Sequence, residues 1–167
     1  MSESTRSGSG SFSARLTELG ITLPPVAAPV AAYVPAVRSG NDVYTSGQLP
    51  FVDGELPKTG LVGVPNDHER AQVTPEEAYD LARTATLNAI AAIDDVAGID
   101  NVERIVKVNG FVASAPGFGG QPGVVNGASE LLGEIFGDAG THARAAVGVA
   151  ELPLGSPVEI ELIARVK

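Results

Sequence analysis

The stretch that decides the fold is residues 142–166, HARAAVGVAELPLGSPVEIELIARV. Two runs of small and apolar residues flank a segment that contains Pro and Gly, which predicts two short strands joined by a turn. Because alternate side chains of a strand share a face, Arg144 lies among alanines and glycine, which cannot screen its charge. Two interpretations stay open: Arg144 binds a planar anion from outside the chain, or it pairs with Glu159 or Glu161 on the next strand.

The second of these strands has two unlike faces. Glu159, Glu161, Ile163 and Arg165 alternate with a wholly apolar set, and only one of the two sets can lie beneath helices. The chain is 44% hydrophobic and only 19% charged, too few charges to cover a second, solvated sheet face. We therefore expect the chain to self-associate through that face. The apolar set consists of Val158, Ile160, Leu162, Ala164 and Val166.

The longest predicted helix begins at Thr74. Thr74 is an N-cap, proline follows at the first helical position, and Glu77 completes a capping box. Apolar residues then recur at helical spacing until Gly98, a glycine suited to end the helix. A second helix starts near Val124 and ends at Gly137. Further predictions are a short helix over residues 14–19, a hairpin of strands 33–37 and 42–48, a loop over 50–66 with a short strand at 61–64, a strand over 102–113 and a Gly-rich loop over 116–123.

This element order predicts the fold class. Strands and helices follow one another as ββ-α-β-α-ββ, which gives an α+β sandwich of two layers with two helices on one face of a mixed sheet. We expect residues 14–167 to form a single domain. Residues 1–13 are rich in Ser and Gly and are expected to form a disordered tail.

Composition excludes several classes of function. The chain has no cysteine, and its two histidines, His68 and His142, are far apart in sequence, so we expect no metal site. A formal net charge of −9 disfavours nucleic-acid binding. We find neither a secretory signal nor a stretch of about 18 apolar residues, and we therefore expect a soluble cytoplasmic protein without membrane contact.

Three separate segments place polar groups among small or apolar residues. They are Tyr33, the run Thr45-Ser46-Gly47-Gln48, and Arg144 with Glu159 across the last hairpin. Each has a structural alternative: Ser46 is a turn hydroxyl, and Asn126 is a helix cap or an exposed polar residue. The chain lacks the pattern of a Ser-His-Asp triad or a phosphate loop.

The same motifs resemble those of the RidA/YjgF family, over roughly residues 25–167. The resemblance rests on Tyr33, YTSGQLP at 44–50, VNG at 125–127, ARAAV at 143–147, and Leu-Pro followed by VEIE at 158–161. The segments GASELL at 127–132 and FG at 136–137 are more similar to a less-characterised subgroup than to the archetypal deaminases.

This resemblance implies a fold, an assembly and an activity. It implies a chorismate-mutase-like homotrimer whose three sheets enclose a barrel-like core, with clefts between subunits. It also implies that Arg144 holds a substrate carboxylate, and that Tyr33, Ser46, Asn126 and Glu159 line or support the cleft. Archetypal members carry a cysteine two positions after the arginine, where this chain has Ala146.

The expected activity is cofactor-free hydrolysis of reactive 2-enamines and 2-imines to 2-keto acids and ammonia. Arg144 would fix the carboxylate, and either Glu159 or backbone carbonyls near it would orient the attacking water. One alternative is a non-catalytic trimer that binds small carboxylates as a regulator. An endoribonuclease, an activity attributed to some relatives, is disfavoured by the acidic charge.

Overall fold

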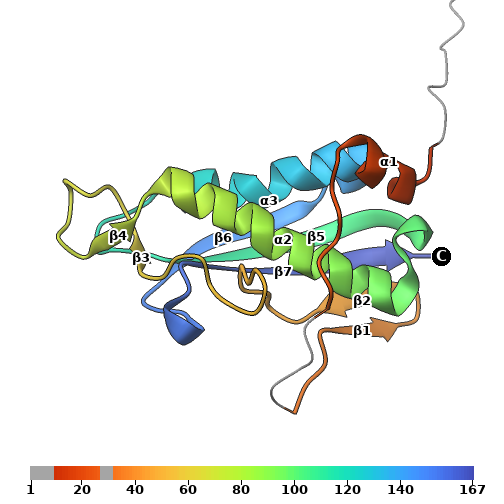
Figure 1. Ribbon diagram of the computed structural model, residues 1–167, viewed down its shortest axis with the longest axis horizontal. Helices are drawn as coiled ribbons and strands as arrows, with labels where there is room; N and C mark the ends of the chain where they lie inside the picture. Colours follow the sequence, from red (N-terminus) through yellow and green to blue (C-terminus); the bar gives the residue numbers. More distant parts are fainter. Residues whose placement is uncertain (1–9, 27–31) are drawn as a thin grey trace, which may run out of the picture.

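The computed structural model describes residues 10–26 and 32–167 (Figure 1). Two long helices, α2 (Pro75–Ala97) and α3 (Gln121–Phe136), cover one face of a five-stranded sheet. The sheet consists of β1 (Ala36–Ser39), β2 (Asp42–Thr45), β5 (Val102–Ala113), β6 (Ala143–Val149) and β7 (Val158–Val166), in the spatial order β1-β2-β7-β5-β6.

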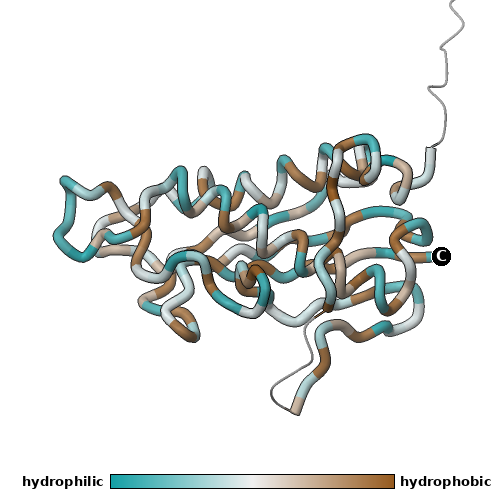
Figure 2. The backbone as a smooth tube through the Cα atoms, viewed as in Figure 1, coloured by the Kyte–Doolittle hydropathy of each residue, from teal (hydrophilic) through white to brown (hydrophobic). Residues whose placement is uncertain are grey.

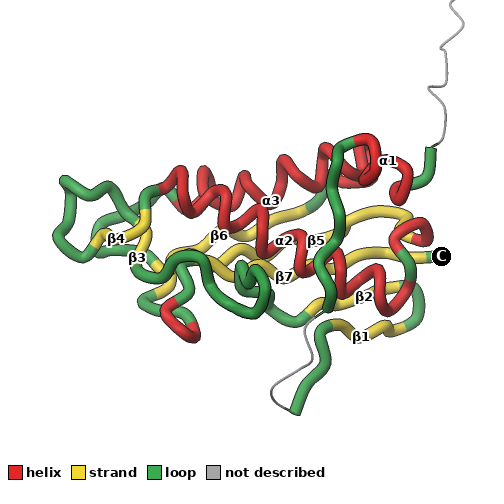
Figure 3. The backbone as a smooth tube through the Cα atoms, in the orientation of Figure 1, coloured by secondary structure: helices red, strands yellow, loops and turns green. Residues whose placement is uncertain are grey.

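The sheet is mixed, as the sequence predicts. Strands β5 and β6 run parallel, and the pairs β1–β2, β2–β7 and β5–β7 run antiparallel. All three α-helices lie on the same side of this sheet (Figure 3). The predicted two-layer α+β architecture is therefore confirmed.

The predicted helix signals act as expected. The Thr74 side chain accepts a hydrogen bond from the Glu77 amide, and the Glu77 carboxylate accepts one from the Thr74 amide. Gly98 and Gly137 are the C-caps of α2 and α3, both with positive φ, a conformation that glycine adopts without a steric penalty.

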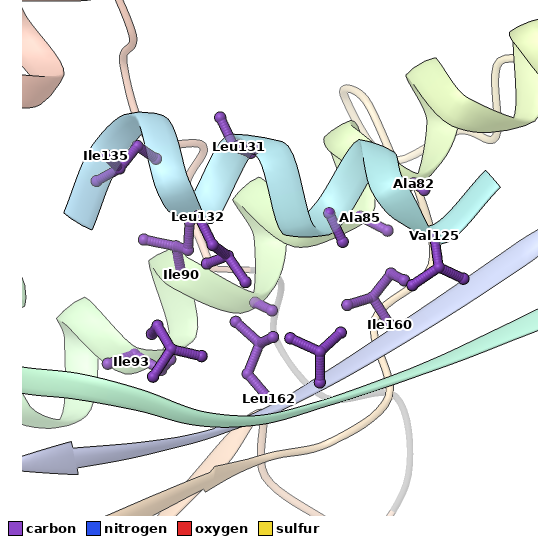
Figure 4. Close-up of a cluster of buried hydrophobic side chains, with 14 of the residues drawn as sticks. Ala82, Ala85, Ile90, Ile93, Val125, Leu131, Leu132, Ile135, Ile160 and Leu162 are labelled. Carbon is purple, nitrogen blue, oxygen red and sulfur yellow. The ribbon is translucent and has the colours of Figure 1, made fainter. Parts of the chain in front are cut away.

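The core lies between the two helices and the sheet (Figure 4). The apolar side chains that alternate along β7 point toward the helices, and Ile160 and Leu162 among them are fully buried. Ile90 and Ile93 of α2 and Leu132 of α3 pack above them. The set Glu159, Glu161, Ile163 and Arg165 consequently lies on the opposite, open face of the sheet.

The predicted final hairpin is wrong. Strands β6 and β7 do not pair, because β5 lies between them and bonds to both. The connection from β6 to β7 includes a 3-10 turn at Pro153–Gly155 rather than a tight hairpin turn. A parallel β5–β6 pair accounts for this arrangement, since α3 is the crossover that returns the chain to the same edge.

The predicted first hairpin forms, with shorter strands. β1 begins at Ala36 rather than at residue 33, and β2 ends at Thr45 rather than at residue 48. Pro35 has no amide hydrogen to contribute to a sheet ladder, which is consistent with a strand that starts after it. The turn residue Gly40 has a φ of 61°.

Two smaller features complete the description. A two-stranded parallel sheet, β3 (Leu61–Val62) and β4 (Ala71–Val73), lies at one end, and the sequence does not predict β4. The connection between them is hydrophilic (Figure 2). Helix α1 (Phe12–Glu18) begins inside the segment expected as a tail, residues 1–9 of which lie outside the described part of the chain. No helix in the described residues is long and apolar enough to cross a membrane.

Candidate functional site

Arg144 lies on the helix-facing side of β6, one of the two edge strands of the five-stranded sheet. Its Nη1 donates hydrogen bonds to Asn126 Oδ1 at 2.7 Å and to Ser129 Oγ at 3.2 Å, both on α3. Its Nη2 lies 3.4 Å from the carbonyl oxygen of Pro122. The guanidinium is therefore oriented by neutral oxygen atoms.

The predicted alternative of an ion pair between Arg144 and Glu159 or Glu161 is wrong. Strand β5 separates their strands, and both glutamates point to the open face while Arg144 points toward α3. Within residues 10–26 and 32–167, Arg144 forms no salt bridge with a carboxylate. Its positive charge is therefore not neutralised by a carboxylate of these residues.

A serine and a histidine lie next to this arginine. Ser129 Oγ is 2.9 Å from His142 Nε2, and His142 Nδ1 is 2.6 Å from the carbonyl oxygen of Gly140. Sequence reasoning does not single out Ser129. The available signal is its spacing three residues after Asn126, which puts both side chains on one face of a helix.

Asn126 is an internal residue of α3 and not a helix cap. The cap of this helix is Gly120, which makes no side-chain capping bond. The amide oxygen of Asn126 instead accepts the hydrogen bond from Arg144. Glycine at the next position lets α3 approach α2 closely, because a β-carbon built at Gly127 would collide with the backbone carbonyl of Tyr79.

Glu159 belongs to a second group of polar residues on the open face of the sheet. Burial raises the pKa of its carboxyl above the ordinary value, and the nearby charge of Glu161 raises it further. Glu161 itself accepts a hydrogen bond of 2.8 Å from Asn109 Nδ2. A β-carbon built at Gly47 would collide with the Glu159 carboxylate, so the missing side chain makes room for this acid.

Ser46 ties the end of β2 to the segment before β1. Its Oγ donates to the Val34 carbonyl at 2.6 Å, and its amide donates to the Pro35 carbonyl at 2.8 Å. The Ser46 hydroxyl thus bonds to the backbone, as its structural interpretation expects, although Ser46 follows a strand and does not lie in a turn. Tyr33 lies in the same segment with 56% of its surface exposed.

The predicted site residues Tyr33, Ser46, Asn126, Arg144 and Glu159 do not line one common cavity within the described part of the chain. Arg144 and Asn126 lie on the helix side of the sheet, and Glu159 lies on its open face. The two cavities characterised, of about 420 and 290 Å³, lie elsewhere, beside β3, β4 and the loop over residues 115–119. A site that uses both groups consequently needs a second copy of the chain.

The chain is similar to several known proteins over most of its length. It is 43% identical over 157 residues to Protein TCP17 of Trypanosoma cruzi, covering 93% of this chain and 94% of that protein. It is 34% identical over 137 residues to the 2-iminobutanoate/2-iminopropanoate deaminase of Escherichia coli K12, covering 82% and 89% of the two chains.

Solved structures share the fold. The protein Atu1372 of unknown function from Agrobacterium tumefaciens has a TM-score of 0.81 at 41% identity, with 93% and 92% coverage. A "putative endoribonuclease" from Shewanella oneidensis MR-1 has a TM-score of 0.86 at 34% identity, with 94% and 100% coverage. E. coli TdcF with bound serine has a TM-score of 0.60 at 27% identity, with 87% and 94% coverage.

The family profile described as "YjgF/chorismate mutase-like, putative endoribonuclease" matches residues 13–166. This match covers nearly the whole chain, and the mixed sheet with its two covering helices agrees with the chorismate-mutase-like fold that the profile describes. The chain belongs to the YjgF/RidA family.

Proposed function

We propose that the chain hydrolyses reactive 2-enamines and 2-imines to 2-keto acids and ammonia, without a cofactor. The observation that carries this proposal is the Arg144 guanidinium, which is oriented by the oxygens of Asn126 and Ser129 and forms no ion pair within the described residues. The 34% identical deaminase and the bound serine in TdcF support a small amino-acid-derived ligand.

Arg144 would bind the substrate carboxylate. A planar guanidinium matches a carboxylate with two parallel hydrogen bonds, a geometry that the ammonium of lysine cannot reproduce. Because its Nη1 is held by two residues of α3, the remaining donors have a defined direction. Fixing the carboxylate also fixes the adjacent C=N carbon, which is the position that water must attack.

Glu159 would serve as the base for that water. A carboxyl whose pKa is raised by burial is a better proton acceptor than an ordinary glutamate. The carboxylate would take a proton as the water oxygen bonds to the iminium carbon, and would return it to the nitrogen. The carbinolamine would then expel ammonia, and its hydroxyl proton would leave with the ammonia as the keto acid forms.

The site would lie between subunits of a homotrimer. Arg144 and Asn126 would come from one subunit, and Glu159, Ser46 and Tyr33 would come from its neighbour. This arrangement is supported by the placement of the two groups on opposite faces of one sheet. The apolar side chains on the open face give a reason for the subunits to associate.

The first prediction tests Arg144 directly. Arg144→Ala should abolish keto-acid release from imines generated by an amino-acid oxidase. Arg144→Lys should retain at most about 1% of the activity, because lysine cannot form the two parallel hydrogen bonds to the carboxylate. The assay follows keto acid in competition with semicarbazide, and a thermal melt of each variant reports the fold.

Arg38→Ala is the matched control. Arg38 is an exposed arginine of the first hairpin that donates to the backbone carbonyls of Gly40 and Lys167, and its loss should leave hydrolysis intact. Near-full activity of Arg144→Lys would contradict the proposed role. Tight binding of 2-ketobutyrate by a wild-type protein without turnover would identify a regulatory carboxylate-binding trimer instead.

A further inference from the structure

Ser129 and His142 have the geometry of a nucleophile and its base. Their closest atoms, Oγ and Nε2, are 2.9 Å apart, and His142 is held in turn by the Gly140 carbonyl at 2.6 Å. A hydroxyl, a base within hydrogen-bond reach and a third group that orients the base are the signature of an activated nucleophile. The third group here is a backbone carbonyl, and among residues 10–26 and 32–167 no carboxylate pairs with His142.

The backbone carbonyl determines the tautomer of His142. A carbonyl oxygen can only accept a hydrogen bond, so the Nδ1 atom must carry the proton. Nε2 is then unprotonated in the neutral ring and accepts the hydrogen bond from the Ser129 hydroxyl. This is the protonation state that a general base requires.

Arg144 completes the arrangement. Its Nη1 donates to the same Ser129 Oγ at 3.2 Å, which favours negative charge on that oxygen. Because a guanidinium nitrogen lies 3.2 Å from Oγ, Arg144 brings a positive charge close to any carbonyl that Oγ attacks. Ser129, His142 and Arg144 are each partly exposed, so a small molecule has access to them.

We propose that Ser129 is the nucleophile of a second activity, the hydrolysis of short-chain carboxylic esters. Ser129 Oγ attacks the acyl carbon while its proton moves to His142 Nε2, and Arg144 stabilises the oxyanion. The C–O bond to the alcohol then breaks as His142 returns that proton to the leaving oxygen. Water attacks the acyl-serine, gives one proton to His142 and releases the acid, and the proton returns to Ser129.

Two features define the substrate class. Because the guanidinium faces the oxyanion, the ester needs no charge of its own. The partial exposure of all three residues favours a short acyl chain. This activity shares Arg144 with the proposed imine hydrolysis but does not use Glu159. Labelling of Ser129 requires no imine turnover, so the failure of one activity can be told from the failure of the other. A small carboxylate that occupies Arg144 should inhibit it.

The test is labelling of the purified full chain with an alkyl fluorophosphonate. An activated serine oxygen bonds to the phosphorus of this reagent and displaces its fluoride. We expect one adduct per chain at Ser129. Trypsin releases residues 108–144 as one peptide, in which Ser114 is the other serine, so fragmentation must distinguish the two. The matched control is Ser114→Ala. The Ser114 hydroxyl donates to the Val112 carbonyl, and the variant that lacks it should be labelled at the wild-type rate.

Ser129→Ala should remove the adduct and the hydrolysis of p-nitrophenyl acetate. His142→Gln, which keeps a polar side chain but removes the base, should slow labelling by about 100-fold or more. Absence of an adduct on wild-type protein, an adduct at Ser114, or an unchanged labelling rate in a folded His142→Gln variant would overturn the proposal. Site mapping on the wild type needs no variant, so a misfolded variant does not prevent the decision.

Discussion

At the residue scale, the candidate site consists of charges that no side chain in the described part of the chain neutralises. Arg144 is oriented by neutral oxygens, and Glu159 is partly buried beside another acid, which raises its pKa. Groups of this kind reduce stability in isolation and concentrate at functional sites. Their positions on different faces of the sheet indicate that assembly, rather than the single chain, would bring them to one ligand.

The raised pKa of Glu159 predicts a pH-dependent cost in stability. A carboxyl whose pKa is higher in the folded state than in the unfolded state favours folding when protonated, and that contribution is lost as the pH rises through the folded-state pKa. Glu159→Gln should therefore have a higher Tm than the wild type at pH 7. The difference should shrink as the pH falls toward about 4, where the unfolded carboxyl is also protonated.

Differential scanning calorimetry of both proteins across this pH range checks the prediction. Glu151→Gln serves as the control, because Glu151 is an exposed carboxylate in the connection between β6 and β7. A Tm difference between Glu159→Gln and wild type that stays constant from pH 7 to pH 4 would rule out the desolvated acid as its cause.

At the element scale, the position of α3 depends on one glycine. Helices α2 and α3 pack side by side over the sheet, and Gly127 faces the backbone of Tyr79 and Arg83 on α2. Asn126 and Ser129, which hold Arg144, are close to this contact in the chain. A shift of α3 away from α2 would consequently move the oxygens that orient the guanidinium.

Two glycine substitutions on this helix separate packing from helix propensity. Gly127→Ala should cost about 3 kcal/mol of unfolding free energy, because the new β-carbon collides with a backbone carbonyl that cannot rotate away. Gly133→Ala places its β-carbon in open space on the same helix and should gain about 0.5–1 kcal/mol.

Urea denaturation of both variants measures these changes. Equal effects of the two substitutions would mean that the close approach of α2 and α3 does not stabilise the fold. If the Gly127→Ala variant folds, its imine hydrolysis should fall by more than the loss of folded protein accounts for. The reason is that the substitution displaces Asn126, which orients Arg144.

At the scale of the whole molecule, one face of the five-stranded sheet is left uncovered by helices. Val37 and Tyr44 are paired across β1 and β2 and are 53% and 46% exposed. Val147 of β6 is 43% exposed, next to Phe111 of β5. Exposed apolar side chains gathered on one sheet face are typical of a surface that associates with another subunit.

We therefore predict a homotrimer at micromolar concentration. Sedimentation equilibrium should give three times the 17.0 kDa mass of the chain. Val147→Lys, which puts a charge on the open face, should yield monomers and lose imine hydrolysis. Val96→Lys should remain trimeric, because Val96 is a similarly exposed valine at the end of α2, away from the sheet. A monomeric wild type would contradict both the assembly and the intersubunit cleft.

The sequence by itself determined the elements whose signals are local. The capping box at Thr74, the glycine stops at Gly98 and Gly137, and the alternation of β7 act within a few residues, and each appears in the structure as predicted. Strand β5 has the predicted limits, Val102–Ala113. The fold class was predictable because it follows from the order of these locally specified elements along the chain.

Tertiary structure alone decided which strands are neighbours and which side chains meet. Consecutive strands commonly pair, so a β6–β7 hairpin was the natural expectation, but α3 returns β6 to the edge of β5 and leaves β7 on the other side. That crossover gives Arg144 its partners on α3 instead of Glu159, and it brings Ser129 to His142. These contacts join residues separated by 13 to 18 positions, and no short-range pattern of the sequence encodes such distances.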